Sequence, residues 1–241
     1  MAISLPEHPW SLDTYCNLID DLIASGRRLG WFSEPADEST ILLRHDVDLD
    51  LDLALSHARA VAERRHFATY YFLLRGTTYN LLDDHGRDVV TVVRSLGHRV
   101  GLHVDASLYA AEQLEAGIAT EIATFENLIG LEIDSLSFHR PATNPIDYDA
   151  LQLDRPHSYE GRFFSDMAYV SDSKGRWNAP GIPDAGALQL LTHPVWWVGD
   201  HPSSARRLAA LLTRRESSFA TAARGYLSNF DDLTGKIRLT E

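Results

Sequence analysis

The sequence is poor in cysteine, in basic residues and in long apolar runs. Its single cysteine, Cys16, excludes a disulfide within the chain, and its place on the apolar face of a helical pattern indicates a core residue. The 34 acidic residues outnumber the 22 basic ones, and a net charge of −12 argues against binding nucleic acid by phosphate neutralisation. No apolar stretch approaches the roughly 20 residues that span a bilayer. We therefore expect neither nucleic acid nor a membrane as partner.

The chain also lacks the features that mark a leader or a domain boundary. Its first ten residues contain no basic region followed by an apolar run, so we expect no signal peptide and a cytoplasmic location. No low-complexity linker, repeat or charge block divides the sequence. Because 241 residues can bury one substantial core, we expect a single domain over residues 1–241.

Short β-rich runs alternate with amphipathic helical patterns. The first helix is expected to begin after Ser11 and end at Gly26, and a late helix to end at Gly225. The expected strands cover 40–44, 67–74, 99–104, 133–138, 163–170 and 187–191, with helices between the first four and an irregular stretch at 141–183. This alternation predicts an α/β fold with a parallel sheet and right-handed crossovers, either a barrel or an open doubly wound sheet.

Four apolar strands run directly into polar residues that include a histidine. The four strand ends are Arg44-His45-Asp46-Val47-Asp48, His103-Val104-Asp105, His139-Arg140-Pro141 and Thr192-His193-Pro194. In a barrel, the carboxyl ends of the strands converge on one mouth, where active sites are built. Carboxylates and imidazoles that meet there are ligand types for a divalent metal and partners for acid–base chemistry.

Each of these polar residues also has a structural interpretation. One of the acids near Asp50 is expected to cap the helix that follows. Two acids that flank Val47, however, place both carboxylates on one side of an extended chain, which favours a shared site over capping. We interpret the remaining histidines as surface or structural residues, namely His8, His57, His66, His85, His98, His157 and His201.

At these strand ends the chain resembles the polysaccharide deacetylase (NodB-like) family of carbohydrate esterases, which fold as distorted (β/α) barrels. The resemblance rests on four segments in the family's order, between about residues 40 and 195: Arg44-His45-Asp46-Val47-Asp48, Gly97-His98-Arg99-Val100-Gly101-Leu102-His103, Phe138-His139-Arg140-Pro141 and Leu190-Leu191-Thr192-His193. It implies a single catalytic barrel that hydrolyses an amide C–N bond. The implied substrate is an N-acetylated sugar or a glycan precursor.

The resemblance also implies a role for each motif residue. Asp46 would be the general base and His193 the general acid. Asp48 and His103 would be ligands of a divalent metal, with Zn²⁺ favoured. Arg140 would orient Asp46 or bind substrate, although it stands one place after the position where many relatives have their arginine.

The third metal ligand is open. The family's second motif continues to another histidine four residues after the first, and here that position is Ser107. The nearby substitutes are His139, Asp105 and His45. We favour His139, because it ends a strand and an imidazole keeps the ligand set borderline-soft, as Zn²⁺ prefers. The missing histidine also leaves open a metal-independent hydrolase of cyclic amides such as allantoin, or an inactive barrel that binds a glycan or a protein.

The irregular stretch 141–183 and the residues after His193 contain candidate substrate contacts. Asp172 and Trp177 could contact a sugar ring, and Trp196 could form a stacking floor. Lys174 with Arg176 could meet a phosphate or another anion, and the alternative is an exposed polar turn. Because an enzyme of the cytoplasm does not reach finished cell-wall polymer, we expect a nucleotide- or lipid-linked precursor or a small metabolite as substrate.

Overall fold

The computed structural model describes residues 3–8, 10–143, 146–227 and 230–234. The chain divides into two compact units, Met1–Asp200 and His201–Glu241. The second unit consists of α6 (Ser204–Tyr226) and α7 (Phe230–Thr234). A single catalytic domain over the whole chain therefore stays a prediction. In the part of the chain that the structure describes, no helix has the length and apolar character needed to cross a bilayer.

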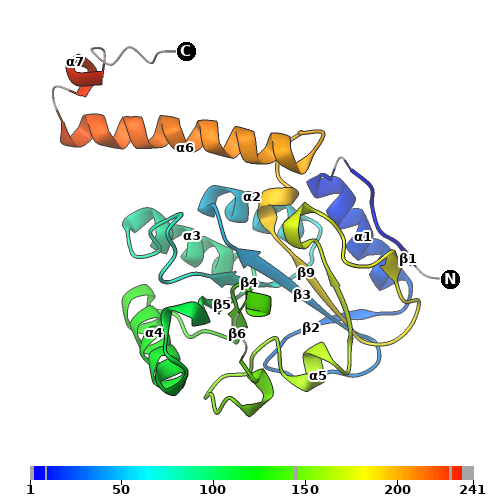
Figure 1. The fold of residues 1–241 in the computed structure, drawn as a ribbon. Coiled ribbons are helices and arrows are strands. Elements are labelled where there is room, and N and C mark those ends of the chain that lie inside the picture. Colours follow the sequence, from blue (N-terminus) through cyan, green and yellow to red (C-terminus); the bar gives the residue numbers. More distant parts are fainter. Residues whose placement is uncertain (1–2, 9, 144–145, 228–229, 235–241) are drawn as a thin grey trace. The chain divides into compact units, whose positions relative to one another are not determined.

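A curled parallel sheet forms the centre of the first unit (Figure 1). Its strands in spatial order are β6 (Leu136–Phe138), β5 (Arg99–Val104), β4 (Thr69–Phe72), β3 (Thr40–Val47), β9 (Leu188–Thr192) and β7 (Ala168–Ser171). β2 (Arg28–Gly30) pairs with the first part of β3, and β4 pairs with its second part. A separate antiparallel pair joins β1 (Ile3–Ser4) and β8 (Gly181–Ile182).

Helices cover the outside of this sheet, as crossovers between parallel strands require. They are α1 (Leu12–Ala24), α2 (Leu51–Glu63), α3 (Asp84–Ser95) and α4 (Leu114–Ile129). The short α5 (Gly161–Phe164) instead packs through Phe163 against Leu42, on the face of β3 that also carries Arg44 and Asp46. Ser11 caps α1 through a capping box, and the side chain of Asp50 accepts a hydrogen bond from Leu53 N at the start of α2. Gly26, directly after α1, has a φ of +98°, where a residue without a Cβ is favoured.

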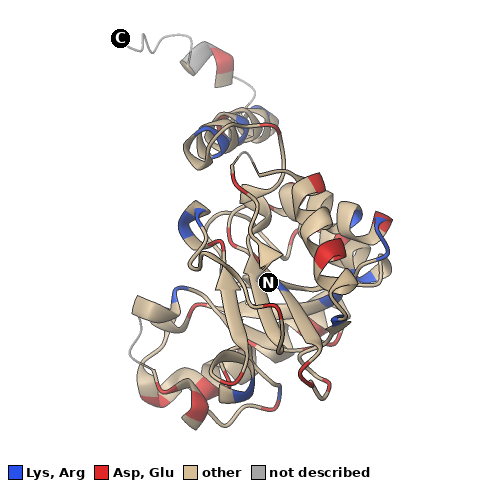
Figure 2. Cartoon of the chain, turned by 90° about the vertical axis from the view of Figure 1, so that its right-hand side faces the viewer, with Lys and Arg blue, Asp and Glu red and all other residues tan. Residues whose placement is uncertain are grey.

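The core lies along β3, whose eight residues are all buried. A parallel strand enclosed on both faces reads as a near-continuous apolar run, and Ile41, Leu42 and Leu43 follow that rule. Figure 2 shows the strand ribbons almost entirely without charged residues, which are concentrated in helices and loops. The charged end of β3, beginning at Arg44, is therefore the exception that needs a chemical explanation.

The predicted distorted α/β barrel is confirmed, as a half-barrel of parallel strands with helices outside. Among the described residues the two end strands, β6 and β7, do not pair with each other. The expected strand at 163–170 is wrong in its first half, because Phe163 lies in α5 and packs into a core cluster with Phe32 and Tyr71. Gly225 does not end the late helix, since α6 continues to Tyr226. Cys16 is buried, as predicted.

Candidate active site

The sheet register brings the polar strand ends to one edge. β3, β5, β6 and β9 are parallel, so their carboxyl ends face the same way. His45 is paired with Thr192, the residue before His193, and Val104 is paired with Phe138, the residue before His139. Short loops after these strands then carry their side chains over the same edge of the half-barrel, as expected for a barrel mouth.

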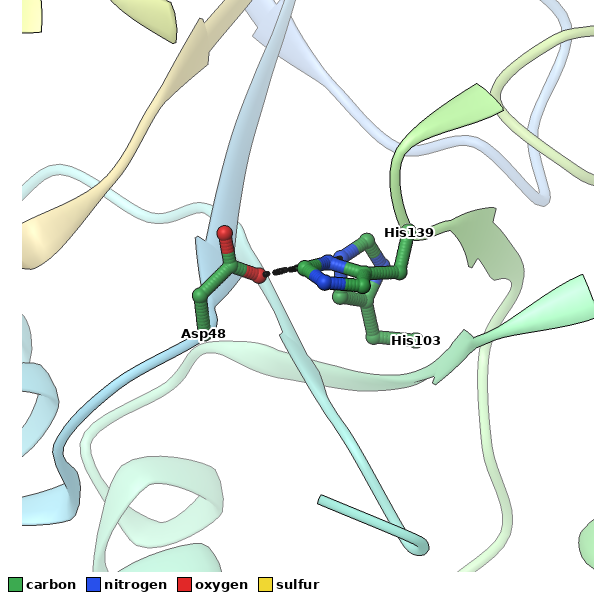
Figure 3. Close-up of side chains that lie close together, drawn as sticks. All are labelled: Asp48, His103 and His139. Carbon is green, nitrogen blue, oxygen red and sulfur yellow. Dashed lines mark hydrogen bonds and ion pairs between the residues drawn. The ribbon is translucent and has the colours of Figure 1, made fainter. Parts of the chain in front are cut away.

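Three side chains converge there on one point. The Oδ1 atom of Asp48 lies 3.1 Å from Nε2 of His103 and 3.3 Å from Nδ1 of His139, and the two nitrogens are 3.3 Å apart. Figure 3 shows both imidazoles turned toward the same carboxylate. Of the three substitutes considered for the third ligand, the structure places His139 in this cluster.

The carboxylate oxygen at the centre lacks a good hydrogen bond. Oδ1 of Asp48 is buried and accepts no hydrogen bond of favourable geometry among the described residues, although two imidazole nitrogens lie within 3.3 Å. Burial by itself would raise the pKa of Asp48, but the two imidazoles and His193 hold that pKa well below its usual value. Asp48 is therefore an ionised carboxylate whose buried Oδ1 is available to a further partner.

The tautomer of His103 follows from its other neighbours. Oγ of Ser137 donates to Oδ1 of Asp46 at 3.4 Å, so it accepts from Nδ1 of His103 at 2.5 Å. With the proton on Nδ1, the lone pair of Nε2 points at Asp48. A lone pair facing a carboxylate is repulsive unless a cation lies between them, and metal-bound histidines are fixed by this kind of hydrogen bond from the other ring nitrogen.

The spacing of the three atoms fits a divalent metal. Ligand atoms held at 2.0–2.2 Å around a tetrahedral Zn²⁺ lie roughly 3.3–3.5 Å from one another. The three separations here are 3.1, 3.3 and 3.3 Å. One carboxylate oxygen and two imidazole nitrogens are also an ordinary donor set for this ion. Asp48, His103 and His139 therefore form a candidate divalent-metal site.

The other two substitutes point elsewhere. His45 lies on the opposite face of β3, where its ring nitrogens contact the hydroxyls of Tyr15 at 3.1 Å and Thr192 at 2.7 Å. Asp105 accepts a hydrogen bond from Ser107 N and pairs with Arg140 at 2.8 Å. Strand alternation explains the first case, because neighbouring residues of a strand face opposite sides.

Asp46 pairs with Arg44, and this corrects the expectation that Arg140 orients it. The Arg44 guanidinium donates to both carboxylate oxygens, at 2.9 and 2.7 Å, and both side chains are buried. Burial alone would raise the pKa of Asp46, but Arg44 holds it below the usual value. Arg140 is instead exposed beside Asp105, and a contact between Arg140 and substrate stays a prediction.

His193 is held by Asp172. Nδ1 of His193 donates to Oδ1 of Asp172 at 2.6 Å, and Trp197 Nε1 donates to the other oxygen at 2.7 Å. Burial would lower the pKa of His193, but the Asp172 carboxylate outweighs it and raises the pKa to about 9. The opposite nitrogen, Nε2, lies 3.7 Å from Oδ2 of Asp48. Asp172 is fully buried, so the expectation that it contacts substrate is corrected: it orients His193.

The two tryptophans expected at the substrate are divided. Trp196 lines the pocket described below and is 9% exposed. Trp177 does not line it; its indole N–H donates to the carbonyl of Pro6 at 3.1 Å, and its ring packs against Trp10 and Trp197. The expectation that Trp177 binds substrate is therefore corrected, because its polar atom and its ring face are both used in packing.

A pocket of about 430 Å³ opens above the cluster. This volume lies in the range of about 300–1,000 Å³ that is usual for small-molecule sites. Asp48, His139 and His193 line its polar side, while Asp46 and His103 lie behind them. The apolar side is formed by Leu49, Leu73, Leu108, Val195 and Trp196. The pocket thus offers a candidate metal site, an imidazole and an apolar wall to one ligand.

Comparisons with known proteins place this chain among remote neighbours. No protein-family model and no curated protein sequence matches it. It is similar in structure to BA3943, a CE4 family pseudoenzyme from Bacillus anthracis, with 13% identity, a TM-score of 0.43 and coverage of 74% of this chain and 60% of that one. The Xyl-CE4 domain of a multidomain xylanase from the hindgut metagenome of Trinervitermes trinervoides is 14% identical, with a TM-score of 0.42 and coverage of 83% of this chain and 93% of that one. The peptidoglycan N-acetylglucosamine deacetylase Bc1960 is 14% identical, with a TM-score of 0.41 and coverage of 81% of this chain and 90% of that one.

Similarity at this level does not transfer an activity, so the functional argument rests on the side chains of this chain. Two residues that support the site were missed in the sequence. Arg44 stands two places before Asp46, and Ser137 two places before His139. In both cases the strand period of two places the residues on one face, which was a usable signal.

Proposed function

We propose that this chain is a metal-dependent hydrolase that cleaves an amide C–N bond, most simply the N-acetyl group of a sugar or glycan precursor. The observation that carries the proposal is the convergence of Asp48, His103 and His139, of which Asp48 and His139 line a pocket together with His193. This placement combines a site for a Lewis acid with a proton donor, which amide hydrolysis needs.

Asp48, His103 and His139 would hold the metal, with Zn²⁺ favoured by the donor set. When bound, the ion supplies Lewis acidity to the acyl carbonyl and to the attacking water. Ser137 keeps the lone pair of His103 directed at the site, through the hydrogen bond to Nδ1.

Asp46 and His193 would move the protons. Water adds to the acyl carbon, its proton passes to Asp46, the C–N bond breaks, and Nε2 of His193 protonates the leaving amine. Oδ2 of Asp46 borders the metal cluster, 3.7 Å from Nε2 of His103, and Arg44 keeps this carboxylate ionised and ready to accept. Asp172 holds the proton of Nδ1, so His193 presents Nε2 to the pocket.

The first test measures metal content and amine release together. We expect about one metal ion per chain by elemental analysis, and release of amine and acetate from at least one member of a panel of N-acetylated sugars. His139→Ala should weaken metal affinity by at least roughly 100-fold. The matched control is His85→Ala, because His85 is an exposed histidine on α3 outside the pocket. Equal metal binding by the two variants would contradict the ligand assignment.

Two further variants test the proton-transfer roles. Asp46→Asn and His193→Ala should retain the metal but lose roughly 10²–10⁴ in kcat, the usual contribution of one acid or base. Thermal unfolding of each variant shows whether it is folded. Full activity in either would contradict its role. A metal-free protein that hydrolyses cyclic amides in the presence of chelator would instead support the metal-independent alternative.

A further inference from the structure

The pocket carries more positive charge than the rest of the chain would lead one to expect. In a protein of net charge −12, the lysine, arginine and acidic residues of its lining are three cations, Arg75, Arg140 and Lys174, and two acids, Asp48 and Asp105. Asp105 is paired with Arg140 at 2.8 Å, and Asp48 faces the two imidazoles of the candidate metal site. Arg75 and Lys174 thus form no ion pair with these two acids, although Arg75 interacts electrostatically with Asp105 and with Glu121.

Lys174 is fixed at the pocket by an unusual backbone. Its φ of +63° lies in the left-handed region, which costs a non-glycine residue about 1 kcal/mol or more. The turn that imposes this conformation follows Asp172, and Gly175 N donates to the carbonyl of Asp172 at 2.9 Å. His8 contacts the carbonyl of Gly175 at 3.2 Å from the other side. The same turn therefore positions Lys174 and, through Asp172, His193.

Arg75 is fixed by a different loop. It follows β4, and this loop is tied to the end of β3 by two hydrogen bonds, from Thr78 Oγ1 to Asp48 O at 2.7 Å and from Tyr79 OH to Val47 O at 2.6 Å. The Arg75 guanidinium lies 5.5 Å from the centre of the Tyr109 ring, a cation–π distance. It also hydrogen-bonds the side chain of Tyr109, whose hydroxyl donates to Glu121. No ion pair joins Arg75 or Lys174 to an acid within residues 3–8, 10–143, 146–227 and 230–234.

The side chains of Arg75 and Lys174 are exposed, but the loops that carry them are held at the pocket by hydrogen bonds. Several surface arginines of the first unit have carboxylate partners, as Arg28, Arg64, Arg87 and Arg162 do. An arginine fork and a lysine ammonium on rigid loops are the usual donors to phosphate and carboxylate oxygens. We propose that the substrate bound in this pocket carries an anionic group, a phosphate or a carboxylate, which Arg75 and Lys174 bind. The acyl group of the same substrate then faces the candidate metal site.

The position of the acyl group in this inference rests on the proposed function. The binding of an anion does not, because it can be measured without turnover. Isothermal titration calorimetry at low ionic strength would use three probes: N-acetylglucosamine, N-acetylglucosamine 6-phosphate and N-acetylmuramic acid. Since anions also coordinate divalent cations, each titration is repeated on chelator-treated protein. We expect at least one charged probe to bind roughly tenfold or more tightly than the neutral sugar in both preparations, and this preference to shrink as salt is added.

Variants locate the binding site. Arg75→Gln and Lys174→Gln should each weaken binding of the preferred charged probe by roughly tenfold and leave the neutral sugar unaffected. Arg59→Gln is the matched control, because Arg59 is exposed on α2 and does not line the pocket. Comparison of the phosphate with the carboxylate probe shows which anion is preferred.

The outcomes separate the two proposals. The inference is overturned if neither charged probe binds, if neutral and charged probes bind equally, if the preference vanishes with the metal, or if Arg59→Gln weakens binding as much as Lys174→Gln. Amine release is followed in the same samples. Charge-selective binding without amine release from any probe overturns the proposed hydrolysis alone, while release from the neutral sugar with no charge preference overturns the anion inference alone.

Discussion

At the scale of single residues, the site contains two buried carboxylates with different partners. Asp46 pairs with a permanent cation, Arg44, and therefore stays ionised. Asp172 pairs with His193, whose protonation it stabilises and whose ring it orients. One carboxylate is thus suited to accept a proton from water, and the other acts through an imidazole that can donate one.

Asp172→Asn should separate orientation from metal binding. The amide keeps the shape of the side chain but removes the charge that holds the proton on Nδ1 of His193. We expect kcat to fall by roughly 10²–10⁴, the range of one general acid, with metal content unchanged. Steady-state kinetics with elemental analysis measures both. Asp166→Asn is the control, since Asp166 is exposed and outside the pocket. A loss of metal in Asp172→Asn would show that this aspartate supports metal binding instead of acting through His193 alone.

Arg44→Met should destabilise the fold. The substitution leaves the Asp46 carboxylate buried without its cation, and breaking one side of a buried ion pair costs about 3–5 kcal/mol. Urea denaturation measures the free energy of unfolding. Arg28→Met is the matched control, because the Arg28–Asp37 pair is equally close at 2.6 Å but exposed, so its loss should change stability by at most about 1 kcal/mol. Similar values for the two variants would contradict the burial argument.

At the scale of elements, β3 divides the polar residues between two faces. Arg44 and Asp46 point to the side of the candidate metal site, while His45 points to the side of Tyr15 and Thr192. A slip of one residue in the register with β9 would exchange the two sets and destroy the site. The register is secured by pairing of β3 with β2, β4 and β9, all parallel to it.

Close packing between β4 and β5 gives a prediction at this scale. A Cβ on Gly101 would lie 2.4 Å from the ring of Tyr71 and 2.7 Å from the carbonyl of Ser135, so it cannot be accommodated without a shift. We expect Gly101→Ala to destabilise the protein by roughly 1–3 kcal/mol, the cost of overpacking. At Gly161, in contrast, the nearest atom is 3.6 Å away, so Gly161→Ala should have little effect. Calorimetric Tm values compare the two, and equal values would contradict the packing argument.

At the scale of the whole molecule, a set of buried histidines makes the fold sensitive to acid. Burial, with neighbouring imidazoles, lowers the pKa of His57 to about 3 and holds that of His45 well below its usual value, and burial lowers that of His98. The unfolded chain binds protons on these side chains near pH 6.5, and the folded chain does not. For His57, stability therefore falls as the pH drops from about 6.5 toward about 3, by up to about 1.4 kcal/mol per pH unit.

Urea denaturation between pH 7.5 and pH 5 measures this dependence. His57→Asn should reduce the slope of the unfolding free energy against pH. The reduction is at most that of one bound proton, about 1.4 kcal/mol per pH unit. Tyr70→Phe is the control, because it removes the hydroxyl 2.9 Å from Nδ1 of His57 but leaves the imidazole. It should lower stability and keep the wild-type slope. Equal slopes in His57→Asn and wild type would show that His57 is not buried as a neutral side chain.

Much of this architecture could be read from the sequence, because local patterns carry it. The strand ends at Asp48, His103, His139 and His193 stood out as polar residues after apolar runs, and the structure brings all four together. The first helix and its cap at Ser11 followed from periodicity and from capping chemistry. The misassigned start of the strand at 163–170 shows the limit, because Phe163 is apolar in either setting and only its contacts decide.

The sequence by itself determined which residues end the strands, and therefore which chemistry can gather at the mouth of the half-barrel. Only the tertiary structure decided the partners: Arg44 rather than Arg140 beside Asp46, His139 rather than His45 beside Asp48 and His103, and Asp172 beside His193. The reason is physical. Strand identity depends on neighbours along the chain, whereas pairing depends on which faces and loops the crossovers bring within a few ångströms.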